Sequence, residues 1–426
     1  MNLVGKRLLV LGGMRISCEI VNKAKSMGVV VGVADYNSIL DSPGKQIADE
    51  HYETSVTDVD AVVSLIKEAK FDGVIVGFND MLLPYYAEIC LKAGLPCYGT
   101  KEQFDILIDK AKYKSLCRRF GIPTIPEYQL EDANIEFPVL VKPVDSSGSR
   151  GITRCYGYDE LILAYDKAMA ASKSKKVLIE RYMEGREVTV FWVFRDGEYY
   201  LAAMGNRHVK NNQGKDVVPL PVGYTFPSVF LPKYRNEVED NCKLMFQYLG
   251  IKNGMMFMQC KVENDTCYVY DIGYRLTGSL EYRILERVCG YNPLEMLINF
   301  SLTGAMEIGD LKGKVTPCFK CPAFNVSILS SPGKIKSIEG LETIKTFPEV
   351  ENVFVSHIPG EEISDNMRGL LTQITVRVLG TVSDEKDLLQ IIKKIENTID
   401  IISDVGVSIK LSGIDENDID GFVLSC

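Results

Sequence analysis

A lysine that ends an otherwise apolar segment is the feature that most constrains this chain. The segment from Pro138 reads P-V-L-V-K, which predicts a buried strand from Val139 to Lys142. A buried ammonium group destabilises a fold unless an anion neutralises it. The anion is either a bound phosphate or a carboxylate of the chain in a structural ion pair.

A loop of small residues follows this strand directly. It reads D-S-S-G-S-R-G from Asp145 to Gly151, with Ser147, Gly148 and Ser149 at its centre. Small residues let backbone N–H groups approach an anion closely and let a loop move. Such loops also form hairpin tips, but the position after the strand lysine favours a phosphate site.

The segment V-L-I-E-R-Y-M-E-G-R-E-V-T-V, from Val177 to Val190, carries the residues expected around a flat base. Glu180 follows three apolar residues of a predicted strand, and Tyr182 and Met183 are suited to enclose a base while main-chain groups pair with its edge. Glu187 is placed to bond ribose hydroxyls. The alternative reading of Glu187 is an exposed strand carboxylate.

Two further segments carry candidate cations. A predicted helix contains Lys110, Lys112 and Lys114, and most lysines on such a helix are solvated. Lys110, which follows Asp109 at the helix start, is the candidate to turn inward to phosphate, although the residues alone favour a solvated side chain. Arg207, in G-N-R-H-V-K, is either a phosphate ligand or a surface arginine.

The composition excludes some classes of partner. The chain has 426 residues, of which 46% are hydrophobic, which is enough for more than one core. Its net charge of -9 leaves no broad basic face for nucleic acid. No apolar run is long enough for a membrane span, so we expect a cytoplasmic protein that acts on small molecules.

The first hundred residues read as alternating strands and helices. Strands are expected at residues 7–11, 29–34, 73–76 and 96–99, with helices between them, which predicts a parallel sheet. Gly12 and Gly13 form a turn directly after the first strand. They do not complete a G-x-G-x-x-G motif, so a plain turn is favoured over a dinucleotide site.

On Lys142 with its serine loop, and on the spacing from Glu180 to Glu187, the chain resembles ATP-grasp enzymes of the carboxylate–amine ligase group. It is similar also to carbamoyl phosphate synthetase halves and biotin carboxylases. The resemblance implies an α/β and α+β multidomain fold. This fold has a Rossmann-like domain at residues 1–100, a two-part ATP-grasp module at 101–310 and an α+β C-terminal domain at 311–426. Within the module, the small lid subdomain is expected at about 115–185 and the large subdomain at 186–310.

The resemblance also implies roles for individual residues. Two lysines would contact the ATP phosphates, a flexible loop would cover them, and the segment around the second predicted strand would bind adenine and ribose. The residues concerned are, in that order, Lys110 and Lys142, then Ser147, Gly148 and Ser149, then Glu180, Tyr182, Met183 and Glu187.

The magnesium signature of the family is only partly present. It has an acid on one strand and E-x-N-x-R on the next, whereas this chain offers Gln259 and then D-I-G-Y-R from Asp271 to Arg275. Asp271 and Arg275 match, while Gln259 and Gly273 depart. We expect Asp271 and Gln259 to hold Mg²⁺, with Mn²⁺ as a substitute.

The implied activity is that of an ATP-dependent ligase. It would activate a small carboxylate as an acyl phosphate and join it to an amine, with Arg275, Lys142 and Arg207 as catalytic residues. One alternative is a carboxyphosphate-forming enzyme acting on bicarbonate, which the presence of a single module disfavours. Another is a non-catalytic ATP-binding sensor, suggested by Gln259 and Gly273. We expect a homodimer, and we expect no catalytic cluster in the C-terminal unit.

Overall fold

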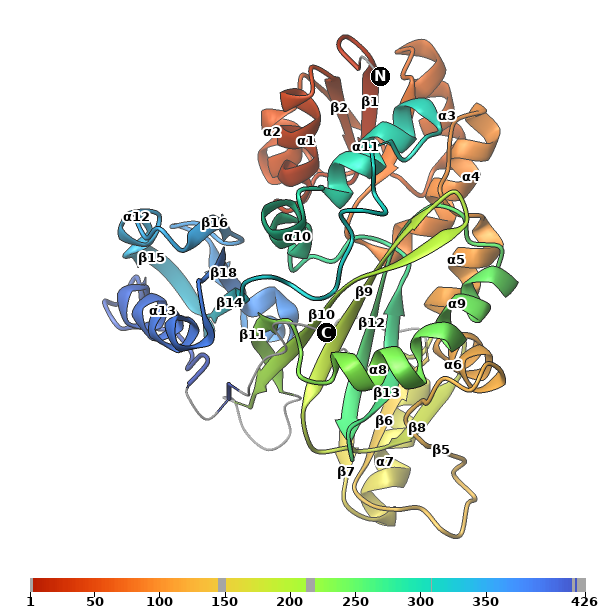
Figure 1. Cartoon of the computed structure of the whole chain (residues 1–426), viewed down its shortest axis with the longest axis vertical. Coiled ribbons are helices and arrows are strands. Elements are labelled where there is room, and N and C mark those ends of the chain that lie inside the picture. Colours follow the sequence, from red (N-terminus) through yellow and green to blue (C-terminus); the bar gives the residue numbers. More distant parts are fainter. Residues whose placement is uncertain (1–2, 145–150, 212–218, 308, 416–417, 420–426) are drawn as a thin grey trace.

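The computed structural model describes residues 3–144, 151–211, 219–307, 309–415 and 418–419. Its N-terminal part is a parallel sheet in the order β3-β2-β1-β4, flanked by helices (Figure 1). The strands are β1 (Arg7–Leu11), β2 (Val30–Asp35), β3 (Glu50–Glu53) and β4 (Gly73–Val76). The main helices are α1 (Ser17–Ser26), α3 (Val59–Glu68), α4 (Leu83–Ala93), α5 (Lys101–Ile108) and α6 (Lys110–Arg119). Apolar strands buried on both faces form the core of this part.

The expected strand at Pro96–Gly99 is wrong, and β3 takes the fourth place in the sheet. β3 reads E-H-Y-E and is half-exposed at the edge of the sheet, so it lacks the apolar run that signals a buried strand. Tyr98 instead packs beneath the central sheet, where its hydroxyl donates to the carbonyl of Tyr274 at 3.1 Å.

The central part is an antiparallel sheet of eight strands in the order β13-β12-β9-β10-β11-β14-β18-β16. Its first five strands are β13 (Thr266–Gly273), β12 (Gly254–Glu263), β9 (Glu187–Arg195), β10 (Glu198–Lys210) and β11 (Leu220–Phe226). Helices α8 (Leu231–Glu237) and α9 (Glu239–Tyr248) lie along this sheet (Figure 1). The ring of Phe246 on α9 lies 5.1 Å from that of Trp192 on β9, which shows that α9 packs on one face of the sheet.

A second, smaller antiparallel sheet has its own core. Its order is β5-β8-β6-β7, and α7 packs on it. The elements are β5 (Glu127–Tyr128), β6 (Val139–Pro143), β7 (Thr153–Cys155), α7 (Tyr158–Ala171) and β8 (Val177–Arg181). In Figure 1 this unit lies at the end of the central sheet farthest from the N-terminal sheet.

The C-terminal part continues the central sheet. The pairing of Gly223 with Val326 joins β11 to β14, and β18 and β16 follow. The elements are β14 (Ala323–Leu329), β15 (Gly333–Glu339), β16 (Val350–Val355), β17 (Glu362–Ile363), β18 (Ile374–Thr381), α13 (Glu385–Thr398) and β19 (Asp400–Ser403). The structure confirms the mixed α/β architecture. The domain boundary expected at residue 311 stays a prediction.

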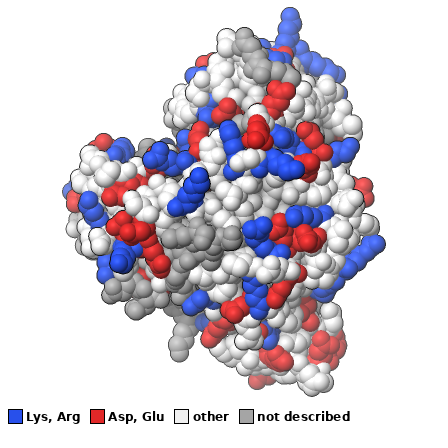
Figure 2. Space-filling model, in the orientation of Figure 1, with Lys and Arg blue, Asp and Glu red and all other residues white. Residues whose placement is uncertain are grey.

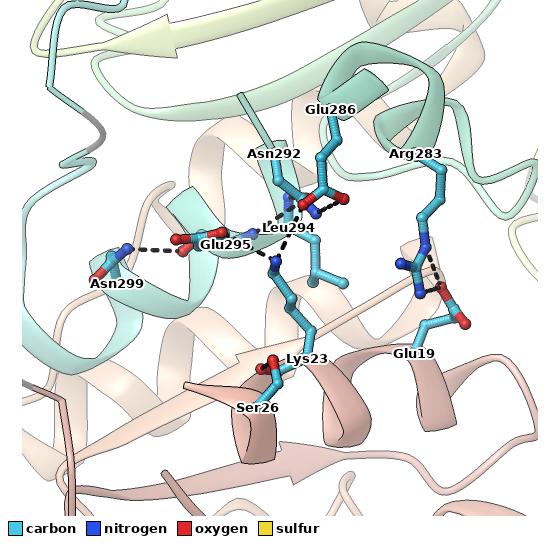
Figure 3. Close-up of polar contacts among 9 residues, drawn as sticks. All are labelled: Glu19, Lys23, Ser26, Arg283, Glu286, Asn292, Leu294, Glu295 and Asn299. Atoms are coloured by element: carbon cyan, nitrogen blue, oxygen red, sulfur yellow. Dashed lines mark hydrogen bonds and ion pairs between the residues drawn. The ribbon is translucent and has the colours of Figure 1, made fainter. Parts of the chain in front are cut away.

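Ion pairs fix the N-terminal sheet against the centre of the molecule. They join α1 to α10 (Glu281–Cys289) and α11 (Pro293–Thr303) (Figure 3). Lys23 lies 3.2 Å from Glu286 and 3.0 Å from Glu295, and Arg283 lies 2.8 Å from Glu19. These contacts pack α1 against α10 and α11.

The surface carries charges of both signs. Lysine and arginine are interspersed with aspartate and glutamate over the face shown in Figure 2. Among the described residues, no helix combines the length and the hydropathy that crossing a membrane requires.

Candidate active site

The first element of the site is the start of α6, where an aspartate sets the orientation of two lysines. Asp109 caps the helix, and its carboxylate accepts from the backbone N–H groups of Ala111 at 3.0 Å and Lys112 at 3.1 Å. Lys110 and Lys114 then lie one turn apart on the same side of the helix. That side faces the small sheet, because Lys114 reaches Glu180 on β8.

Lys114 is fully buried, so the expectation that it is solvated is wrong. Its ammonium is paired with Glu180 and lies 3.2 Å from Glu127 on β5. Burial lowers the pKa of Lys114 to about 8, although Glu127 opposes the shift. Lys114 therefore belongs to the interior of the site.

Lys142 lies at the centre of the site, only 5% exposed. Its ammonium lies 2.5 Å from Glu180 Oε2, so the ion pair considered as an alternative from the sequence is present. Burial lowers the pKa of Lys142 well below its usual value, and the nearby charges of Lys114 and Lys110 lower it further. Glu180 is thus shared by two ammonium groups, of which Lys114 also pairs with Glu127. Lys114 and Lys110 lie close enough to Lys142 to affect its pKa, and such a cluster of three lysines is suited to an anion.

The two predicted base-binding residues after β8 differ in their exposure to solvent. Met183 is buried, with 2% of its surface exposed. Tyr182 is partly exposed, and the guanidinium of Arg154 lies 4.8 Å from the centre of its ring. Glu180 itself points to the lysines, while the predicted contacts of this segment with adenine stay a prediction.

The metal-binding candidates lie side by side on three neighbouring strands. Gln259 on β12 is directly opposite Asp271 on β13 and Thr189 on β9. Burial raises the pKa of Asp271, and the charges of Lys110 and Lys142 oppose this rise. The hydroxyl of Thr189 is buried and has no hydrogen-bond partner among the described residues. These oxygens fit a hard cation such as Mg²⁺, which completes its shell with water and substrate phosphates.

The glycine that replaces the family's asparagine has a structural cause. A Cβ added to Gly273 would lie 2.1 Å from Cε1 of Phe257, because the Phe257 ring fills that space. The guanidinium of Arg275 lies 5.0 Å from the centre of the same ring. The ring therefore fills the space that any side chain at position 273 would need. In the described part of the chain, no three His, Cys, Asp or Glu side chains gather at a metal-binding distance.

Arg275 is held by the N-terminal part of the molecule. Its Nε and Nη2 donate to the two carboxylate oxygens of Asp80, at 2.7 and 2.6 Å, and its Nη1 donates to the carbonyl of Leu276 at 2.7 Å. Both Asp80 and Arg275 influence the pKa of Asp271. Arg275 therefore lies next to the candidate metal ligand.

Glu187 and Arg207 form a buried ion pair farther along the central sheet. Glu187 is 7% exposed, and it bonds Arg207, Lys261 at 2.7 Å and the hydroxyl of Tyr270 at 2.8 Å. The alternatives of an exposed carboxylate and a surface arginine are therefore wrong. Burial alone would raise the pKa of Glu187, but Arg207 and Lys261 outweigh it and lower the pKa to about 2. Binding of ribose by Glu187 and of phosphate by Arg207 stays a prediction.

Three predicted residues of the phosphate loop, Ser147, Gly148 and Ser149, lie outside the described residues. Two residues of the site, Lys114 and Asp80, were not predicted from the sequence. The spacing of four residues from Lys110 could have indicated Lys114. Nothing in the local sequence links Asp80 to Arg275, which follows it by 195 residues.

Part of the chain matches a known domain family. Residues 135–280 match the model of the ATP-grasp domain family. Among curated proteins, the chain is 26% identical over 301 residues to the carbamoyl phosphate synthase large chain of Clostridium beijerinckii. The match covers 68% of this chain but only 27% of that relative.

Solved structures share the fold over almost the whole chain. The L-amino acid ligase of Bacillus licheniformis superposes with a TM-score of 0.75 at 19% identity, covering 94% of this chain and 99% of the ligase. The biotin carboxylase domain of the Hydrogenobacter thermophilus 2-oxoglutarate carboxylase gives a TM-score of 0.76 at 19% identity, covering 96% of this chain and 92% of that domain. That structure contains MgADP and bicarbonate.

Proposed function

Because residues 135–280 match the ATP-grasp domain family, we propose that this chain is an ATP-dependent ligase that activates a small carboxylate as an acyl phosphate and joins it to an amine. The observation that carries the proposal is the convergence of Lys110, Lys114 and Lys142 on a region next to Asp271. Three lysines that converge next to a candidate metal carboxylate suit a triphosphate with its metal.

The chemistry of such a reaction is dominated by charge. A carboxylate that attacks the γ-phosphate brings two anions together, and each pair of unit charges 4 Å apart costs about 4 kcal/mol at an effective dielectric of about 20. Lys142 and Lys110 would stabilise the transferring phosphoryl group. Asp271 and Gln259 would hold Mg²⁺, which when bound supplies further positive charge to the phosphates.

Arg275 would position the substrate carboxylate. An arginine has five N–H donors, of which Arg275 uses three, for Asp80 and the carbonyl of Leu276. The two remaining donors are free to bind an incoming anion in the described structure. The bonds to Asp80 fix the plane of the guanidinium, so that those donors are oriented before substrate arrives. The amine would then displace phosphate from the acyl phosphate, and ADP and phosphate would leave.

A non-catalytic ATP sensor is the second candidate, favoured by the Phe257 ring, which fills the space that a side chain at position 273 would need. A bicarbonate-dependent enzyme is the third, supported by the likeness to a carbamoyl phosphate synthase large chain and to a biotin carboxylase domain solved with bicarbonate.

One assay separates these candidates. The protein is incubated with ATP, Mg²⁺ and hydroxylamine, together with a panel of carboxylic acids that includes the L-amino acids, and hydroxamate and phosphate are measured. Hydroxamate with one class of acid supports the ligase, because hydroxylamine traps acyl phosphates. Phosphate release with bicarbonate alone supports the third candidate. ATP binding in calorimetry without any release supports the sensor.

A cytoplasmic location, a homodimer and the use of Mn²⁺ belong to the same proposal. Size measurement in solution tests the dimer, and replacement of Mg²⁺ by Mn²⁺ in the hydroxamate assay tests the metal.

A further inference from the structure

A buried polar cluster lies where α10 packs against β18, beyond the residues assigned to the nucleotide. We define the α10–β18 cluster as Glu281, Asn325 and Arg377, which are 2%, 0% and 8% exposed. It combines elements of the central and C-terminal parts of the chain, and no residue of the reaction proposed above belongs to it.

Arg377 is a buried cation without a matching anion. Its Nη1 donates to the hydroxyl of Ser327 at 2.7 Å. Among the described residues no carboxylate lies within ion-pair distance of its guanidinium. Burial lowers the pKa of Arg377, although Tyr224 and Glu281 oppose the shift. An arginine stays protonated in proteins, so such a group is stabilised by an anion that enters from outside.

Glu281 and Asn325 each have a buried oxygen that lacks a hydrogen-bond donor in the described part of the chain. Oε1 of Glu281 and Oδ1 of Asn325 are buried acceptors without a hydrogen-bond donor among the described residues. The other polar atoms of both side chains are engaged: Thr277 donates to Oε2 of Glu281, and Asn325 Nδ2 donates to the carbonyl of Ser279 at 2.5 Å. The side chain of Ser279 also lies against the Glu281 carboxylate, where it opposes the rise in the pKa of Glu281 that burial causes. Two acceptors left in this way call for a ligand that carries N–H donors.

The three side chains lie within one electrostatic environment. Burial lowers the pKa of Arg377 and raises that of Glu281, and the charge of each group opposes the shift of the other. The bond from Asn325 to Ser279 brings the amide next to the start of α10, which begins at Glu281. A single small molecule with an anionic and a cationic end would satisfy the whole cluster.

We propose that the α10–β18 cluster binds the amine substrate and that this substrate is an amino acid. Arg377 pairs with its carboxylate, while Glu281 and Asn325 accept hydrogen bonds from its amino group. The inference rests on the proposed ligase function and names the class of its second substrate.

The position of Glu281 fits this role. Glu281 and Arg275 line the same small cavity, together with Phe257 and Thr277. The amino end of the bound amino acid therefore lies on the side of Arg275, which holds the other carboxylate in the proposed reaction. The carboxylate end lies on the side of the C-terminal sheet.

The test compares nucleophiles in the full-length protein. After the hydroxamate assay has identified the acid, each of the L-amino acids and its amide, which lacks the carboxylate, replaces hydroxylamine. We expect kcat/KM to be at least tenfold higher for a preferred amino acid than for its amide. Equal use of the two overturns the inference and leaves the ligase function intact. Absence of hydroxamate with every acid overturns both.

A variant then assigns the preference to the cluster. In Arg377→Gln the ratio of kcat/KM for the amino acid to that for its amide is expected to fall at least tenfold. Arg368→Gln is the matched control, because Arg368 is an exposed arginine of the same unit, paired with Asp365 at 3.0 Å. An unchanged ratio in Arg377→Gln overturns the assignment. If that variant does not fold, the wild-type ratio still decides.

Discussion

Arg275 and Asp80 join the end of the central sheet to the N-terminal sheet through two parallel hydrogen bonds of 2.7 and 2.6 Å. Parallel bonds of this kind fix the plane of a guanidinium as well as its position. The residue expected to hold the reacting carboxylate is therefore oriented by another part of the chain.

Asp80→Asn tests this relationship. The amide cannot accept two charge-assisted bonds, so Arg275 loses its fixed orientation. We expect kcat/KM for the acid to fall about ten- to hundredfold, because small misplacements of a positioning group are costly, while KM for ATP changes little. Asp60→Asn is the control, since Asp60 is an exposed aspartate paired with Lys92. Unchanged steady-state kinetics in Asp80→Asn would contradict the role of the pair.

Lys142→Met tests the cation at the end of β6. Loss of one preorganised donor to the transferring phosphate typically lowers kcat by about 10² to 10³, and we expect at least that loss of hydroxamate formation. Circular dichroism should show an intact fold, because methionine fills a similar volume. Lys112→Met, on the solvated side of the same group of lysines, should keep full activity. Wild-type turnover in Lys142→Met would remove this lysine from the site.

Gly273→Ala tests the packing of Phe257 against the β13 backbone. A Cβ at this position would meet the ring at 2.1 Å, and overpacking of a core typically costs about 1–3 kcal/mol of the free energy of unfolding. The cost should be smaller in a Phe257→Ala background, where the ring is absent. Denaturant unfolding of the wild type, the two single variants and the double variant gives the coupling free energy between positions 257 and 273. Equal costs in both backgrounds would show that the ring is not the cause.

Glu187 predicts a pH dependence of stability. Its pKa is about 2 in the folded protein against an ordinary value of 4.5. A lowered carboxylate pKa contributes stability above pH 4.5, which is lost progressively as the pH falls towards 2. The shift corresponds to about 3 kcal/mol at pH 7.

Glu187→Gln should therefore be less stable than the wild type at pH 7, and the difference should shrink as the pH falls below 4.5. Denaturant unfolding at pH 7, 4.5 and 3 measures it. Glu342→Gln is the control, because Glu342 is exposed and paired with Lys345 on the surface. A difference that does not depend on pH would mean that Glu187 acts through packing rather than through its charge.

Local sequence predicted most strands and helices of the site correctly. The strand with Lys142 and the helix capped by Asp109 were both expected, because apolar periodicity and capping act within a few residues. The edge strand β3 was missed, since its alternating charged residues carry no such pattern. Lys114 was expected to be solvated, because its burial depends on the small sheet that packs over α6.

The sequence by itself determined which residue types stand at the ends of the buried strands, and hence predicted a phosphate site around Lys142 and Asp271. Tertiary structure alone decided the partners: Glu180 lies between two lysines, Asp80 binds Arg275, and Arg377 has no carboxylate within ion-pair distance in the described part of the chain. Periodicity and capping are properties of neighbouring residues, whereas an ion pair depends on where distant segments cross. Those crossings are set by the packing of whole sheets and helices.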